Sequence, residues 1–241
     1  MTLVKRTRTA AARRALAAGL LLAAVAARGA ESASRPPDPA HAPAADVHEI
    51  RIDPRAFQVV PNDSGPVNYY TVVDDPDGGH IHSEYKPSYE TTVLGWGVPE
   101  DRRHSVARIR WRWRAVTLPD GGNECQSGKN DSAAVVYLTW KRLGRWYGLK
   151  YVWSSVGPRG ATCDKRRNIL RAQDTVVVES GGPLGEWRTV DLVPDVEFRK
   201  HFERGATSEP AAFQGIGIMS DGDQTHSESS ADFGGFVVTF R

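Results

Sequence analysis

The segment 108–115 alternates strictly between arginine and apolar residues. Successive side chains of a β-strand point to opposite faces of a sheet, so this pattern predicts a strand. Ile109, Trp111 and Trp113 then share one face with Ala115, and the four arginines share the other. We therefore expect both tryptophans to be buried and the arginines to be exposed or to line a groove.

Other segments of the chain also have strand character. Residues 133–140 are apolar on both faces, as expected of a central strand, and residues 147–155 alternate large aromatic residues with smaller or polar ones. Turn sequences such as DDPDGG and SGGPLG separate most of the remaining candidates. These candidates are residues 47–52, 69–73, 80–85, 91–94, 175–179, 187–192, 215–219 and 233–240.

Helical character is confined to residues 195–204, where Phe198 and Phe202 are four residues apart and Gly205 is a stop signal. About ten short strands with little helix and no alternation of strands and helices predict an all-β fold. We expect an antiparallel β-sandwich or jelly roll with one short helix near 195–204.

The first 27 residues have the pattern of a secretory signal peptide. Five basic residues and no acidic ones lie within residues 5–14, before an Ala/Leu-rich run at 15–27. This run ends in Val25-Ala26-Ala27, a small-residue cleavage site. Residues 28–45 are rich in proline and alanine, which predicts a disordered linker, and residues 46–241 then form a single β-sandwich domain. We expect export to the periplasm or the extracellular space, by either the general secretory or the twin-arginine route.

Charge and hydropathy exclude two classes of partner. Without the first 27 residues, 26 basic and 29 acidic side chains remain, a formal charge of −3. Such a chain lacks the basic face that duplex nucleic acid requires. No later stretch approaches the roughly 20 apolar residues of a membrane span. We also expect a monomer.

Cys125 and Cys163 are the only two cysteines, and both lie in loop-like sequence. In an exported chain an even pair of cysteines is expected to be oxidised, so we predict a disulfide between them.

Four segments in this order resemble bacterial exported proteins grouped as domain-of-unknown-function family 3047. They are RIRWRWRAVTLP, GKNDSAAVVYLTW, LKYVWSS and GIGIMSDGDQTHSESSADFGGFVV, and the similarity spans roughly residues 56–240. The resemblance implies a galactose-binding-like jelly roll, a scaffold frequent among carbohydrate-binding modules. It implies a fold more than an activity.

Asp221 and Asp223 follow the 215–219 strand with Gly222 between them. Hard carboxylate ligands of this kind suit Ca²⁺, and Asp232 with the Thr225 hydroxyl would complete the set. Two other interpretations are open: an Asx-turn in which the two aspartates cap backbone amides, and direct ligand contact or catalysis.

Further polar and aromatic residues are candidates for ligand binding. The arginine row can hold the carboxylate of an acidic glycan or form a solvated face paired with acids. One or two of the many aromatic residues in 140–153 can form a platform on which a sugar ring stacks, while burial in the core is the favoured alternative for any single tryptophan. The candidates are Arg110, Arg112, Lys129, Asp131, Tyr151 and Trp153.

His80, His82 and Glu84 share one strand face, which permits a metal pair, an acid/base group or a solvated edge strand. No decisive catalytic set is present. We therefore favour a non-catalytic glycan-binding module. The alternatives are a secreted polysaccharide-active enzyme, either a lyase or a hydrolase, and a structural module that recognises other proteins.

Overall fold

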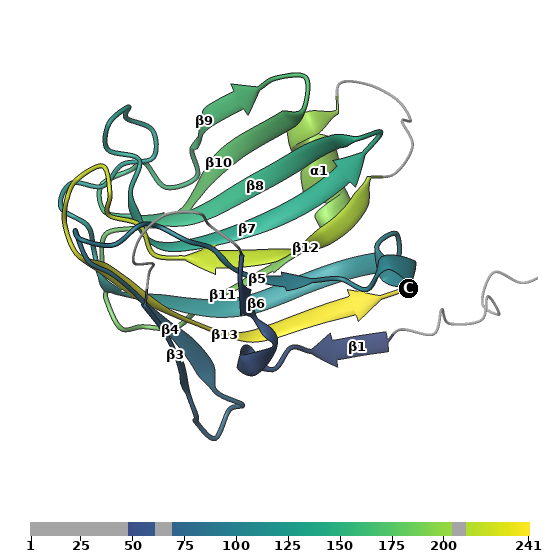
Figure 1. The fold of residues 1–241 in the computed structure, drawn as a ribbon, viewed down its shortest axis with the longest axis horizontal. Helices are drawn as coiled ribbons and strands as arrows, with labels where there is room; N and C mark the ends of the chain where they lie inside the picture. Colours follow the sequence, from purple (N-terminus) through teal and green to yellow (C-terminus); the bar gives the residue numbers. More distant parts are fainter. Residues whose placement is uncertain (1–47, 61–68, 204–210) are drawn as a thin grey trace, which may run out of the picture. The chain divides into compact units, whose positions relative to one another are not determined.

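The computed structural model describes residues 48–60, 69–203 and 211–241. The leader 1–27 and the linker 28–45 lie outside the described residues. The rest forms two stacked β-sheets, called here sheet A and sheet B (Figure 1).

Sheet A has six strands, and its last strand in sequence is central. The order is β11 (Arg188–Leu192), β6 (Val106–Thr117), β13 (Ser229–Phe240), β4 (His80–Tyr85) and β3 (Tyr69–Val73), and β1 (His48–Arg51) also pairs with β13. All of these pairings are antiparallel.

Sheet B has seven strands. In spatial order they are β2 (Gln58–Val59), β5 (Leu94–Gly97), β12 (Ala212–Met219), β7 (Ser132–Arg142), β8 (Arg145–Ser154), β10 (Arg171–Ser180) and β9 (Thr162–Arg167). One pair, β8 with β10, is parallel, because β9 and β10 form a hairpin whose second strand lies against β8.

The core lies between the two sheets and is rich in aromatic residues. Trp111 and Trp113 of β6 are fully buried, as the alternation predicts. Across the sandwich they meet Tyr151 and Trp153 of β8 edge to face, with ring centroids 5.8 and 6.2 Å apart. Offset and edge-on arrangements of this kind are the favoured geometry of aromatic pairs.

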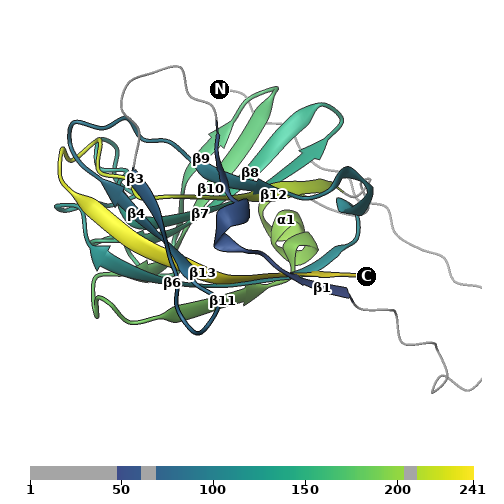
Figure 2. The ribbon, with the colours of Figure 1, turned by 60° about the horizontal axis from the view of Figure 1, so that its bottom comes forward.

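The one α-helix among the described residues, α1 (Pro194–Phe202), lies between the sheets (Figure 2). Phe198 is buried against Trp140 and Tyr147, with ring centroids 5.6 and 5.0 Å apart. The proline at its start has no amide hydrogen to leave unpaired, which favours this position. Two short 3₁₀ helices span Pro54–Ala56 and Glu100–Arg102. No helix in the described residues is long and apolar enough to cross a membrane.

The all-β sandwich expected from the sequence is confirmed, with differences in detail. The strands β2 and β9 were not expected, and β5 begins at Leu94 where the sequence pattern ends. The parallel contact of β8 with β10 also departs from a purely antiparallel fold. β2 has only two residues, β9 has no buried residue, and both lie at an edge of sheet B, so they lack the apolar alternation that identifies the others.

The predicted disulfide between Cys125 and Cys163 is confirmed. The Cα atoms are 5.1 Å apart, within the usual range for a bridge. It ties the loop before β7 to β9, at the edge of sheet B.

Candidate functional site

The outer face of sheet B is hollowed into a groove of about 700 Å³. Its floor consists of glycines at outward-facing positions of three strands: Gly95 and Gly97 of β5, Gly215 and Gly217 of β12, and Gly148 of β8. Cross-strand pairing places Gly215 opposite Gly97 and Gly217 opposite Gly95. A strand face without side chains at these positions leaves a depression on an otherwise continuous sheet.

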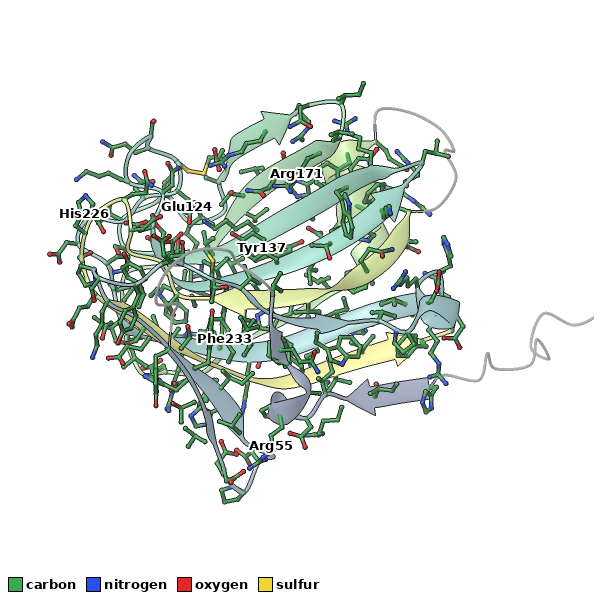
Figure 3. All side chains as sticks on the ribbon, viewed as in Figure 1. Arg55, Glu124, Tyr137, Arg171, His226 and Phe233 are labelled. Carbon is green, nitrogen blue, oxygen red and sulfur yellow. A yellow bond between two sulfur atoms is a disulfide. The ribbon has the colours of Figure 1, made fainter. Side chains whose placement is uncertain are left out.

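The walls of the groove combine aromatic, amide and aliphatic groups. Trp146 is 43 % exposed, and the Lys141 ammonium lies 5.5 Å from the centroid of its ring. Tyr137 of β7 lies between the glycine strands β12 and β8 (Figure 3). Thr139 of the same strand also lines the groove. The other wall residues include Gln58, Val59, Val60, Arg171, Gln173 and Gln214. None of the described residues that line the groove carries a carboxylate.

A second group of polar residues lies at the end of sheet B, where β7 begins and β12 ends. Asp131, Asp221 and Asp223 each offer a carboxylate oxygen, and these three atoms lie within 4.8 Å of one another. Because β7 and β12 are neighbours, the backbone brings the residues together: the Asp221 amide donates to the Ser132 carbonyl over 3.0 Å. We call these three residues the aspartate cluster.

Asp131 is fully buried and accepts hydrogen bonds from two backbone amides. The amides of Gln224 and Thr225 donate to its two oxygens over 3.2 and 2.6 Å. Asp223 is partly exposed and opens the cluster to solvent. At an effective dielectric constant near 20, two unit charges about 4.8 Å apart repel by roughly 3 kcal/mol, so an unneutralised cluster is costly.

Lys150 of β8 is the cation nearest to this cluster, and it is shared. Its ammonium lies 2.7 Å from Glu124 and 3.9 Å from Asp221, and all three side chains are at most 10 % exposed. Figure 3 shows Glu124 at the end of the sandwich where the loops gather. The Ser132 hydroxyl also donates to Glu124 over 2.9 Å. The Lys150 charge is thus largely balanced by Glu124 rather than by Asp221.

Burial raises the pKa of Asp221 to about 7; Lys150 opposes this shift, while the nearby Asp223, Asp131 and Glu124 add to it. Desolvation disfavours the charged carboxylate, and like charges do so further. In addition, Oδ1 of Asp221 is buried and has no hydrogen-bond partner. The structure therefore holds a carboxylate in a place where its negative charge is incompletely compensated.

The family described as "Protein of unknown function (DUF3047)" matches residues 67–237. The chain belongs to this family. No curated protein sequence matches the chain.

Three solved structures resemble the DUF3047 chain at low sequence identity. Endoglucanase 3 of Trichoderma harzianum, from family GH12, is 10% identical with a TM-score of 0.40, over 81% of this chain and 98% of that one. The xyloglucanase domain of NopAA from Sinorhizobium fredii, solved with cellobiose, is 9% identical with a TM-score of 0.40, over 80% and 99%. A Trichoderma reesei endo-1,4-beta-xylanase is 13% identical with a TM-score of 0.32, over 71% and 97%.

The structure brings some of the residues expected from the DUF3047 sequence together and separates others. Asp131, Asp221 and Asp223 meet, but Asp232 does not join them. Its carboxylate accepts from His82 over 2.7 Å and from Arg114 over 2.6 Å, on the outer face of sheet A. This position corrects the expected metal set, because β13 carries Asp232 to the other sheet, opposite His82 in the register.

The aromatic candidates Tyr151 and Trp153 are only 3 % and 1 % exposed, so they belong to the core and not to a surface platform. They point inward because they share the face of Leu149 on β8. Trp146, on the opposite face of the same strand, is the aromatic residue that reaches the groove.

The basic candidates also lie away from the groove. Arg112 contacts Asp75 and Asp77 on sheet A, with its guanidinium 4.5 Å from the centroid of Trp187. Arg110 is exposed on the same face, beside a separate hollow that it lines with Arg51 and Arg112. The arginine row is thus the face of sheet A, paired largely with acids.

Lys129 is exposed and makes no ion pair with a described residue. Lys150 is the lysine that lies beside the aspartate cluster. The Thr225 hydroxyl bonds Ser227. His80 and His82 do not lie on an edge strand, because β4 has neighbours on both sides.

Lys150, Glu124 and the glycine floor were missed by the sequence argument. For Lys150 there was a signal: it is the only charged residue inside the otherwise apolar or aromatic segment 147–153. The floor also had one, since Gly95 with Gly97 and Gly215 with Gly217 each repeat at the two-residue period of a strand. Glu124 lies in a loop without periodicity, and nothing in the sequence links it to Lys150.

Proposed function

We propose that this protein is a non-catalytic module that binds a polysaccharide chain in the groove of sheet B. The observation that carries the proposal is the combination of a glycine floor with an exposed tryptophan wall and several amides. An aromatic ring face provides apolar contact for a sugar ring, and amide and hydroxyl groups hydrogen-bond its hydroxyls.

The dimensions of the groove favour a chain of sugars over a single ring. The groove crosses the outer face from β2 to β10, which is five strand intervals. Neighbouring strands lie about 4.8 Å apart, so this path is roughly 24 Å long. The groove lining is predominantly apolar with a few polar groups, as ligand-binding sites generally are.

The lining favours binding over hydrolysis. Glycoside hydrolysis uses two carboxylates that flank the scissile bond. The described lining supplies amide, hydroxyl, guanidinium and aromatic groups instead. The nearest cluster of acids, Asp131 with Asp221 and Asp223, is at the end of the strands and two of its members are buried.

We also propose that the protein acts outside the cytoplasm, after cleavage of the leader 1–27. The disulfide between Cys125 and Cys163 supports this proposal, since structural disulfides persist mainly in oxidising compartments.

A glycan array followed by calorimetric titration of the best oligosaccharide tests the proposed binding. Trp146→Ala is expected to weaken binding about 30-fold, the loss of roughly 2 kcal/mol typical of a central aromatic contact. Trp187→Ala is the matched control, because it removes an indole that packs against Arg112 and Arg114 of sheet A, away from the groove. It should leave the affinity unchanged.

Three results would contradict the proposal. They are the absence of binding to every glycan, loss of binding in Trp187→Ala with retention in Trp146→Ala, and release of new reducing ends from the bound oligosaccharide. The last result would identify an enzyme, and the second would move the site to sheet A.

A further inference from the structure

The aspartate cluster has a feature that its own internal contacts do not explain. Asp221 is only 7 % exposed, and its Oδ1 has no hydrogen-bond partner. A buried acceptor without a donor is rare in folded proteins and calls for a ligand, ion or water. The three cluster oxygens lie within 4.8 Å of one another, which is the arrangement that a cation would bridge.

The side chains around the cluster supply only part of the positive charge that three carboxylates require. Lys150 is 3.9 Å from Asp221 but 2.7 Å from Glu124, so one ammonium faces two buried acids. Lys129, on the same loop as Asp131, makes no ion pair with a described residue. The cluster therefore has three carboxylates and, among the described residues, only the one ammonium of Lys150, which it shares with Glu124.

The cluster is also rigidly built. Both oxygens of Asp131 are held by the amides of Gln224 and Thr225. A Cβ at Gly222 would lie 2.1 Å from the Ser227 carbonyl, so the turn between Asp221 and Asp223 accepts only glycine. The partly exposed Asp223 leaves a route from solvent. A site with fixed ligands and one open side can accept an ion together with its remaining water.

We propose that Asp131, Asp221 and Asp223 bind a divalent cation, and that this cation is Ca²⁺. The donors are hard carboxylate oxygens with no nitrogen or sulfur ligand among them, which selects against zinc and copper. Ca²⁺ accepts irregular geometry and a variable number of waters, whereas Mg²⁺ requires near-ideal octahedral geometry. A loop site that consists of three carboxylates and solvent therefore fits Ca²⁺ better than Mg²⁺.

The test is thermal unfolding of the full chain after treatment with chelator, with CaCl₂, with MgCl₂, and with NaCl at matched ionic strength. Calorimetric titration of Ca²⁺ gives the affinity. At about a hundred times the Kd, Ca²⁺ should raise the Tm by about 5 °C or more. The rise with Mg²⁺ should be smaller.

Asp223→Asn is the decisive variant, because Asp223 is partly exposed and no described residue hydrogen-bonds it, so the fold should survive. It should lose most of the Ca²⁺-dependent rise. Asp101→Asn is the matched control: it makes the same change of charge at an exposed residue of the Glu100–Arg102 helix. It should keep the full rise.

A wild-type Tm that Ca²⁺ does not change, or a full rise in Asp223→Asn, would overturn the site. An equal response to Mg²⁺ would overturn the assignment to Ca²⁺. None of these results depends on whether a glycan binds, so the two proposals can fail separately.

Discussion

The ammonium of Lys150 lies 2.7 Å from Oε1 of Glu124, and both side chains are nearly inaccessible to solvent. Burial alone would lower the pKa of Lys150, but the neighbouring oxygens of Tyr137, Glu124 and Asp221 raise it, so the lysine is charged. This pair connects the loop before β7 to the middle of sheet B.

Removal of this charge should destabilise the protein strongly. Lys150→Met keeps the volume but leaves Glu124 and Asp221 buried without a cation, which costs about 3 to 5 kcal/mol. Urea unfolding measures the loss. Lys129→Met changes an exposed lysine on the loop that carries Glu124. It should change the free energy of unfolding by less than about 0.5 kcal/mol. Equal effects of the two changes would show that Lys150 is not paired.

Trp113→Ala should destabilise the fold by about 3 to 5 kcal/mol, because it opens a cavity in a fully buried layer. Arg110→Ala on the same strand should cost far less, since Arg110 is exposed. Thermal melts of the two variants compare them directly. The reverse order would mean that the strand register is wrong.

The disulfide should contribute about 4 kcal/mol, because it closes a loop of 38 residues in the unfolded chain. The double change Cys125→Ser with Cys163→Ser should lose this amount in urea unfolding. Reductant should lower the Tm of the wild type and leave that of the double variant unchanged. A wild-type Tm that reductant does not change would contradict the prediction.

The His82–Asp232 pair should make stability depend on pH. The hydrogen bond to Asp232 raises the pKa of His82 above 6.5; burial and Arg114 oppose this, while Glu84 adds to it. Burial would raise the pKa of Asp232, but His82 and Arg114 hold it below 3.8.

The stabilisation that His82 contributes to the folded state is therefore complete below pH 6.5, and it is lost as the pH rises through the folded-state pKa of His82. The stabilisation that Asp232 contributes is present above pH 3.8, and it is lost as the pH falls through the folded-state pKa of Asp232. His82→Asn can still donate to Asp232 but cannot titrate. The Tm difference between wild type and His82→Asn should be larger at about pH 5.5 than at about pH 9. A difference independent of pH would exclude the charged pair.

Gly148→Leu should block the groove without harm to the fold. The nearest atom to a Cβ at this position is Cγ of Gln173 at 3.9 Å, an ordinary contact, and the backbone is not in the left-handed region. The Tm should stay within a few degrees of wild type while glycan affinity falls at least 10-fold, which calorimetry can measure. Unchanged affinity would place the glycan elsewhere.

The sequence predicted the fold well because local alternation is strong in the strands that build the core. Trp111 and Trp113 show this: their burial follows from the two-residue period alone. The same period misled the prediction for Tyr151 and Trp153 only because it does not say which face is inside. That choice depends on the other sheet, which packs Trp111 and Trp113 against them.

The site was predicted less completely because it depends on contacts between distant residues. Asp221 and Asp223 were recognisable as a pair, whereas their association with Asp131 requires β7 and β12 to be neighbours. Likewise Asp232 is close to the pair in sequence, but β13 belongs to the opposite sheet. Spacing along the chain cannot decide between such partners.

The position of β13 has a consequence for the order of folding. This strand comes last among the described strands, yet it lies between β6 and β4 and also pairs with β1, whose residues come first. Sheet A therefore has no continuous hydrogen-bonded network until residues 229–240 are available. Contacts so distant in sequence form late and slowly, so the growing chain should stay open until then.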